Sequence, residues 1–292
     1  MKYLWIFFSG LLLAACNNGE SNMTNTPNNI EIELYGEIEK TVQNSPLEFS
    51  QECMSELDLC WYKFKKSANE KELPSITVKN ARSSLSIEKV TSITMVIDKK
   101  IGNTIENLDI TVRGLPDNSP HEKQKDFIYD LLKKIQSAGW SHYYYPGDPR
   151  ISGSQIGKIP SPDNVLGHLT SSHPWLDPDY ELDIDRWLKI ESFYNWYFYN
   201  DGVYLTFKAW RRDSKDTPDK TGTYLLSMEF LSERDFWSSG FTKDEEKARW
   251  KELLPAQLKR DQEARIAAEN NARAAGIEID ENYKDPVIKA IQ

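Results

Sequence analysis

The feature that most constrains the fold is a run of aromatic residues on both sides of the tight-turn sequence Asn200-Asp201-Gly202. Residues 190–200 and 203–210 flank this turn, and an Asp-Gly pair between two strand-forming runs predicts a β-hairpin. Rings fall at odd and even positions alike, so both faces of the predicted ribbon carry them: Phe193, Tyr194, Trp196, Tyr197, Phe198, Tyr199, Tyr204 and Phe207. One face can enter a core, and we expect something else to cover the other.

Alternating apolar and polar residues predict further strands. Residues 30–35 open the folded body, and residues 86–97 and 108–112 form a second hairpin. Residues 140–145 and 223–231 supply two more strands.

A helix is predicted between Ser119 and Gly139. Ser119 and Glu122 form a capping box, with Pro120 at the first helical position, and apolar residues follow at helical spacing. Gly139 ends this helix, because glycine readily adopts the left-handed conformation that follows a helix.

A longer C-terminal helix is predicted to start at a second capping box, Thr242-Lys243-Asp244-Glu245. Its apolar stripe is interrupted at Pro255, and the helix then runs to Gly276. Four alanines share one of its faces, which we expect to be solvated rather than packed against another backbone: Ala264, Ala268, Ala272 and Ala275.

These elements predict an α+β fold, with antiparallel β-hairpins or a sheet, one packed helix and a long C-terminal helix. Residues 30–292 form the body, as one unit or as two subdomains near 30–150 and 185–275. Residues 145–185 are rich in Pro, Gly, Ser and Asp and have no assigned regular elements, which is typical of a long functional loop.

The charge balance argues against one class of partner. The chain has 36 Lys and Arg against 45 Asp and Glu, a formal charge of −9. Nucleic-acid-binding proteins neutralise phosphates with a basic face, so we expect no nucleic-acid partner. The same acidity would accelerate association with a basic protein surface.

No catalytic motif stands out among the reactive side chains. Phosphate-binding glycine loops, the zincin helix and the Gly-x-Ser-x-Gly turn are missing. One loop groups metal-capable side chains at short spacing and could serve a hydrolase: His168, His173, Asp177 and Asp179. Pro174 and Pro178 explain the same segment as turns, and we favour that interpretation. His121 is expected to be solvated and His142 to be structural. We therefore expect no cofactor, no bound metal and no enzymatic activity.

Residues 1–15 have the form of an export signal, with Lys2 near the start and an apolar run too short to span a bilayer. The run ends in Leu13-Ala14-Ala15-Cys16, which resembles the lipobox of bacterial lipoproteins. This resemblance implies that the Cys16 thiol receives a diacylglycerol, that the chain is cleaved before it, and that the new amine is acylated. Asn17 resembles the outer-membrane pattern, so the implied location is the periplasmic face of that membrane.

Export also bears on the segments that follow. Residues 16–29 hold mainly Asn, Thr, Ser, Gly and Pro, which predicts a flexible tether. Cys53 and Cys60 would meet an oxidising compartment, where two thiols near in sequence pair, so we predict a disulfide between them.

Four short stretches of the body carry a second resemblance: 125–132, 138–140, 143–145 and 148–153. They are similar to segments of immunity proteins for type VI secretion lipase effectors. The resemblance implies a stoichiometric inhibitor that binds an incoming phospholipase toxin and protects the producing cell.

The partner-binding anchors of such an inhibitor are expected in one loop, at Trp175, Asp177, Asp179 and Tyr180. Joint exposure of the rings of Trp175, Tyr197 and Tyr199 would favour an interface over a core. Two alternatives remain open. One is an exported envelope hydrolase that uses the His168, His173 and Asp177 loop, and the other is a structural lipoprotein of a secretion complex, docked through its alanine-faced helix.

Overall fold

The computed structural model of the protein describes residues 29–292. The predicted signal peptide, the lipid site Cys16 and residues 16–28 of the predicted tether lie outside the described residues. The last residue of that predicted tether, Asn29, instead begins a strand and pairs with Ser75. The strands are β1 (Asn29–Glu33), β2 (Ser50–Met54), β3 (Leu59–Lys65), β4 (Ser75–Asn80), β5 (Ser83–Ile87), β6 (Val90–Asp98), β7 (Asn107–Val112), β8 (Ser119–Pro120), β9 (Ser141–His142), β10 (Phe193–Asn200), β11 (Val203–Asp213) and β12 (Thr221–Ser232). The helices are α1 (Ile38–Asn44), α2 (His121–Ser137), α3 (Ile184–Lys189), α4 (Glu233–Ser238), α5 (Asp244–Ala248) and α6 (Trp250–Ala274), with short 3₁₀ turns η1 (Gly153–Lys158), η2 (Pro174–Leu176) and η3 (Lys289–Ile291).

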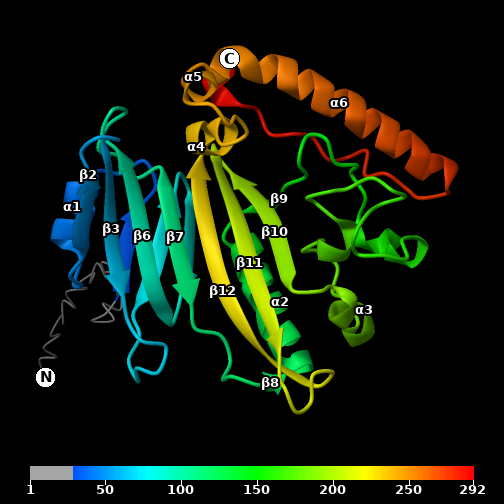
Figure 1. Ribbon diagram of the computed structural model, residues 1–292, viewed down its shortest axis with the longest axis horizontal. Helices are drawn as coiled ribbons and strands as arrows, with labels where there is room; N and C mark the ends of the chain where they lie inside the picture. The colour runs from blue at the N-terminus through cyan, green and yellow to red at the C-terminus, as the bar shows by residue number, and fades with distance from the viewer. Residues whose placement is uncertain (1–28) are drawn as a thin grey trace, which may run out of the picture.

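One large mixed-length sheet forms the centre of the molecule, in the order β2-β3-β6-β7-β12-β11-β10-β9, with β8 beside β12 (Figure 1). All its neighbouring strands are antiparallel. Strand β12 pairs with β7 from Leu226 opposite Val112 to Leu231 opposite Asn107, so hydrogen bonds join the two regions that the sequence left as possible subdomains. The α+β prediction, with antiparallel hairpins and a long C-terminal helix, is confirmed.

The hairpin around Asp201 and Gly202 is also confirmed. Strands β10 and β11 pair from Asn200 opposite Val203 to Phe193 opposite Trp210. Asp201 and Gly202 have φ angles of 41° and 91°. This left-handed pair matches the twist of the flanking strands, which explains why an Asp-Gly turn is favoured here. The register sets which side chains share a face.

The inner face of the sheet is covered by α2 and by the small sheet β1-β4-β5, as Figure 1 shows for α2 behind β10, β11 and β12. The buried strand residues alternate with exposed ones, as a period of two requires. Trp187, Tyr194 and Trp196 stack within this core, with ring centroids 4.3 Å apart for the first pair and 6.1 Å for the second.

The outer face of the same strands is covered at one end by a second aromatic group, the end cluster of Tyr143, Tyr204, Trp237, Trp250 and Leu254. The Tyr204 ring stacks on that of Phe236 at 3.8 Å, and the Trp237 indole N–H donates to the Tyr204 hydroxyl at 3.1 Å. Tyr197 and Tyr199 pack against this cluster. Some of the aromatic rings on the second face are thus also buried in a core.

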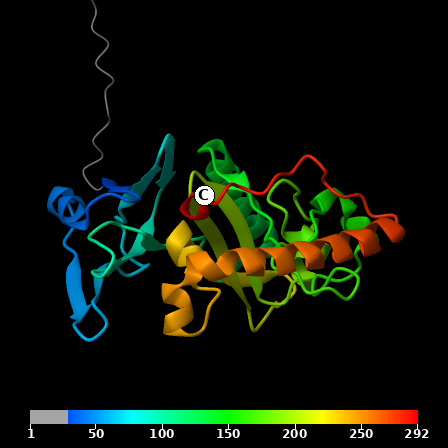
Figure 2. The same ribbon diagram turned by 90° about the horizontal axis from the view of Figure 1, so that it is seen from above.

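Helix α6 lies against the long segment between β9 and α3, and the C-terminal stretch runs back beside it (Figure 2). Arg265, whose side chain is only 4% exposed, holds α6, the long segment and the C-terminal stretch together. Its guanidinium donates to the backbone oxygens of Asp148 at 2.9 Å and Tyr145 at 2.7 Å and to the Asp285 carboxylate at 2.6 Å. A buried charge needs this complete set of partners, because an unpaired one is strongly destabilising.

The alanine face of α6 is partly packed, although the sequence predicts a solvated face. Ala268 and Ala272 are buried, at 8% and 0% exposure, whereas Ala264 and Ala275 are exposed. Small side chains let the helix approach the chain beneath it closely, and this contact is intramolecular.

The predicted helix starts are wrong in detail. Ser119 and Pro120 form the short strand β8 beside β12, and the Ser119 hydroxyl donates to the Pro116 oxygen instead of capping α2. Thr242 is not a cap either, because α5 starts after Lys243 with no side-chain cap. Pro255 lies inside α6, and the helix continues through it.

Three further local predictions need correction. Residues 86–97 are not one strand: β5 ends at Ile87 and pairs in the small sheet, whereas β6 begins at Val90 in the large one. The strand predicted at 140–145 is reduced to β9. His121 is not solvated but 1% exposed, with Nδ1 2.9 Å from the Tyr224 hydroxyl and Nε2 2.8 Å from the Pro218 oxygen.

The Cys53–Cys60 disulfide is confirmed. The two residues are direct partners across the β2–β3 ladder, with Cα atoms 4.1 Å apart. The bond therefore closes the hairpin at the edge of the large sheet.

We expect Arg265→Met to lower the free energy of unfolding by about 3 kcal/mol, because two buried backbone oxygens lose their donors. Urea titration of the purified protein measures this. The control is Arg260→Met, at an exposed position of the same helix, for which we expect a change within about 0.5 kcal/mol. Equal midpoints for the two variants would contradict the anchoring role of Arg265.

Candidate functional site

The outer face of the large sheet is open at the end opposite the end cluster. Three large apolar side chains lie there in one row across three strands, which we call the apolar row: Phe193 on β10, Trp210 on β11 and Leu225 on β12. Phe193 is directly opposite Trp210, and Trp210 is directly opposite Leu225. Their exposed fractions are 66%, 43% and 51%. Directly opposed side chains of this kind are close enough to form one continuous surface.

Polar and charged residues continue this face toward the centre of the sheet. Lys208 and Glu229 lie on neighbouring strands and form an ion pair at 2.6 Å. Asp109 lies opposite Glu229 on β7. Loss of water on the crowded sheet surface and then the charge of Glu229 raise the pKa of Asp109 to about 6, although Lys208 opposes the shift. The face therefore gains negative charge as the pH rises through 6.

Only two of the four predicted anchors reach the surface. Trp175 is 2% exposed, and its indole N–H donates to the Ile159 oxygen at 3.0 Å. Asp177 is 3% exposed and accepts hydrogen bonds from the backbone N–H of Gly153 at 2.6 Å and of Asp179 at 2.9 Å. These two residues support the loop from within. Asp179 and Tyr180 are exposed, so they alone can contact a partner in this conformation.

The loop proposed for a hydrolase does not assemble its site. His173 is 5% exposed, and its Nδ1 accepts from the Trp175 backbone N–H at 3.1 Å, so it caps η2. His168 belongs to a short turn in which it pairs with Val165. Within residues 29–292 neither histidine joins a group of three ligating side chains.

A different histidine meets the two aspartates. His142, Asp177 and Asp179 place one ligand atom each within 4.8 Å of one another. We call them the His–Asp cluster. His142 comes from the edge strand β9, and the aspartates follow η2, so the cluster joins the long segment to the sheet edge. Burial lowers the pKa of His142 even though three aspartates nearby oppose this effect, which favours the neutral imidazole.

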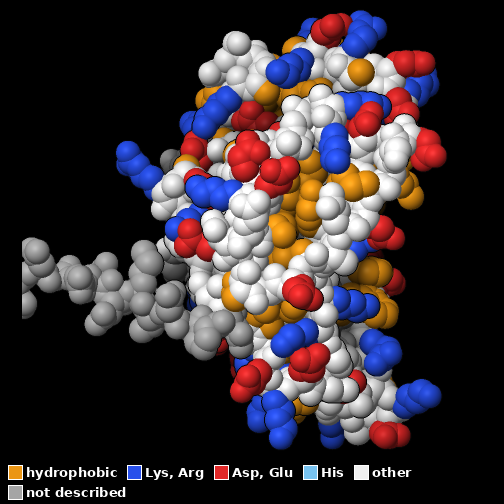
Figure 3. Space-filling view, turned by 90° about the vertical axis from the view of Figure 1, so that its left-hand side faces the viewer, with side chains coloured by type: hydrophobic (Ala, Val, Ile, Leu, Met, Phe, Trp, Pro, Cys, Tyr) orange, Lys and Arg blue, Asp and Glu red, His pale blue; other side chains and the backbone are white. Residues whose placement is uncertain are grey.

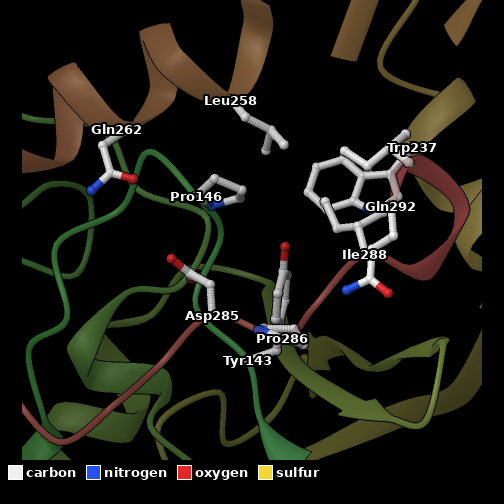
Figure 4. A pocket seen from close by; sticks show the side chains of 10 residues that line it. Tyr143, Pro146, Trp237, Leu258, Gln262, Asp285, Pro286, Ile288 and Gln292 are labelled. Carbon is white, nitrogen blue, oxygen red and sulfur yellow. The ribbon is translucent and has the colours of Figure 1, made fainter. Parts of the chain in front are cut away.

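A pocket of about 400 Å³ lies beneath α6 and the C-terminal stretch (Figure 4). Trp237, Leu258 and Ile288 give it apolar walls, and the Tyr143 hydroxyl points into it. This hydroxyl is buried and has no hydrogen-bond partner among the described residues. The Asp285 carboxylate at its rim is already paired with Arg265. The pocket suits a small, mostly apolar group that accepts one hydrogen bond.

The opposite end of the molecule has a surface on which apolar and charged side chains are mixed. Figure 3 views the side of α1 and β2, where apolar side chains lie between charged ones of both signs. A hollow there is lined by Leu47, Phe49 and Phe64 together with Lys63 and Lys65. Nothing in this mixture selects one kind of ligand.

No family model matches the chain, and neither a curated protein nor a solved structure is similar to it at a significant level. None of the helices among the described residues is long and apolar enough to cross a membrane.

Two features of the site were missed from the sequence. The Phe193–Trp210 pair could have been found, because the Asp201-Gly202 turn fixes the register of the hairpin. The meeting of His142 with Asp177 could not, since 34 residues of irregular chain separate them and no pattern predicts how such a segment returns.

The buried histidine of the loop should make the fold acid-sensitive. Burial lowers the pKa of His173 to about 4, so between pH 6.5 and 4 the unfolded chain binds a proton that the folded chain does not. Stability is therefore lost as the pH falls through this window. His173→Asn keeps a capping acceptor and cannot be protonated.

Between pH 7 and 4.5 the free energy of unfolding should fall in both proteins. We expect the fall to be about 2 kcal/mol smaller for His173→Asn than for the wild type. Urea titrations at the two pH values measure the difference. Parallel losses in both proteins would show that His173 is not responsible.

Proposed function

We propose that the protein is a membrane-anchored periplasmic immunity protein, which binds and inhibits a secreted antibacterial toxin and thereby protects the producing cell. The toxin class that the sequence resemblance favours is a type VI secretion phospholipase. The anchor is the lipid on Cys16, and the implied location is the periplasmic face of the outer membrane.

The observation that carries this proposal is the apolar row on the open sheet face. Phe193, Trp210 and Leu225 form a contiguous exposed apolar surface, bordered by Lys208 and Glu229. A buried aromatic centre with a charged rim is the usual anatomy of a tight protein interface. The three side chains stand on paired strands, so binding does not have to order the backbone that carries them, which favours affinity.

The acidic segment 177–185 also favours a protein toxin as the partner, one with a basic surface. Asp179, Glu181, Asp183 and Asp185 are all exposed, and the whole chain has a charge of −9. Such a surface accelerates encounter with a basic partner in a salt-dependent manner. Tethering to a membrane adds to this effect, because it concentrates the inhibitor where a lipase would act.

The two alternatives have less support. The hydrolase lacks its predicted site, because His168 and His173 join no group of three ligands among the described residues. A structural lipoprotein docked through the alanine face of α6 would need that face free. Ala268 and Ala272 are instead buried against the protein's own chain.

Lipidation can be tested directly. We expect radiolabelled palmitate to enter the wild-type protein and the membrane fraction to retain it. Cys16→Ser should abolish both, because the acyl chains supply the binding energy. Cys53→Ser serves as the control, since that thiol is committed to the disulfide. Label in the Cys16→Ser protein would disprove the anchor.

Protection can be tested without knowing the toxin. Cells lacking this protein should be killed by sister cells that retain it, and the wild-type gene should restore survival. We expect Trp210→Ser to lose at least about tenfold in protection, because removing a central aromatic anchor costs 2 kcal/mol or more.

The matched control is Leu169→Ser, which removes a side chain 80% exposed elsewhere on the surface. We expect it to protect as the wild type does, and both variants should show unchanged unfolding midpoints. Full protection by a stable Trp210→Ser protein would exclude the apolar row as the interface. Survival of the deletion strain would exclude the immunity function itself.

A further inference from the structure

We propose that His142, Asp177 and Asp179 bind a divalent transition-metal ion of the zinc type, which ties the long segment between β9 and α3 to the edge of the large sheet. This inference is independent of the proposed function. It depends on the geometry of the His–Asp cluster and on an unbalanced buried carboxylate.

The spacing of the side chains suits a shared ion better than direct contact. The His142 Nδ1 lies 3.6 Å from Oδ1 of Asp177, too far for a hydrogen bond. Donor atoms bound about 2.0–2.1 Å from a tetrahedral zinc ion stand roughly 3.4 Å apart. The ligand atoms of all three residues lie within 4.8 Å of one another, so a small movement of the exposed Asp179 completes the site.

Asp177 supplies the second observation. Its side chain is 3% exposed, yet among residues 29–292 it forms no ion pair with Lys or Arg, and neither does Asp179. Buried carboxylates in proteins are paired with a cation or coordinate a metal. Among the residues that the structure describes, the only basic group beside the carboxylate is the imidazole of His142. A bound dication would supply the missing charge.

The carboxylates are already oriented by outer partners. The Gly153 backbone N–H donates to Oδ2 of Asp177 at 2.6 Å, and the Gln136 amide donates to Oδ1 of Asp179 at 2.5 Å. Gly153 is required for this approach, since a Cβ there would lie 2.4 Å from Tyr180 Cβ. Hydrogen bonds of this kind fix metal-ligating carboxylates in known sites.

The ligand types select the ion. An imidazole with two carboxylates favours zinc and its first-row neighbours over calcium and magnesium, which prefer oxygen ligands alone. Three protein ligands leave a position for water. The buried His142 and Asp177 hold the ion against the sheet edge, and Asp179 binds it from the solvent side.

The experiment uses the purified protein, stripped with EDTA and titrated with ZnCl₂ at pH 7.5 by calorimetry. We expect one zinc ion per chain, and at a hundredfold excess over the dissociation constant a rise in melting temperature of about 5 °C. Cobalt(II) should bind at the same stoichiometry and give the visible absorption of a tetrahedral complex. CaCl₂ should bind at least about tenfold more weakly.

Variants of the ligands distinguish zinc binding at this site from zinc binding elsewhere on the surface. His142→Asn and Asp179→Asn should each weaken zinc binding by at least about a hundredfold, because changing only an outer partner of a metal ligand already costs about ten- to a hundredfold. Their matched controls, His168→Asn and Asp185→Asn, should bind zinc as the wild type does. Asp179 and Asp185 are both exposed, so this pair stays informative if the His142 variant does not fold.

Three outcomes would overturn the proposal: no saturable zinc binding, zinc binding that Asp179→Asn retains in full, or calcium binding as tight as that of zinc. The first would indicate that Asp177 is balanced by His142 alone.

Discussion

The structure depends on the burial of strand β11 on both faces. Its inner side chains meet α2, and Tyr204 on its outer face meets the end cluster. Covering the rings on either face stabilises the strand, because exposed rings give up the free energy of burial. In the end cluster, α4, α6 and residues 143–145 therefore pack on one end of the outer face. The other end is left open, and there the apolar row lies.

The long segment between β9 and α3 is held by buried polar contacts as well as by apolar packing. Arg265 reaches into it from α6 and satisfies two backbone oxygens, and Asp177 satisfies the backbone of Gly153 and Asp179. Such buried polar contacts are sensitive to any change of partner, since an unsatisfied group costs more than a formed hydrogen bond gains. The same contacts bring His142 to the aspartates. The proposed metal site is thus a consequence of how an irregular segment is fastened to a regular sheet.

The proposed interface and the proposed metal site lie on different parts of the molecule and differ in chemistry. The apolar row belongs to rigid paired strands, which suits recognition of a protein surface. The His–Asp cluster belongs to the sheet edge, where a bound ion would stiffen the acidic segment that follows it. If both proposals hold, the ion would also fix the orientation of Asp179 and Tyr180, the two predicted anchors that remain on the surface.

The sequence by itself determined the elements whose signals are local. The hairpin at Asp201-Gly202, the strand at 223–231, the end of α2 at Gly139 and the Cys53–Cys60 bond all follow from turn chemistry, alternation and spacing over a few residues. Only the tertiary structure decided which faces are buried. Ser119 joins a strand, because its backbone finds a partner in β12. His121 enters the core, Ala268 and Ala272 pack, and His142 meets Asp177. These outcomes depend on segments far apart in the sequence, and burial is a property of the assembled surface that no local pattern encodes.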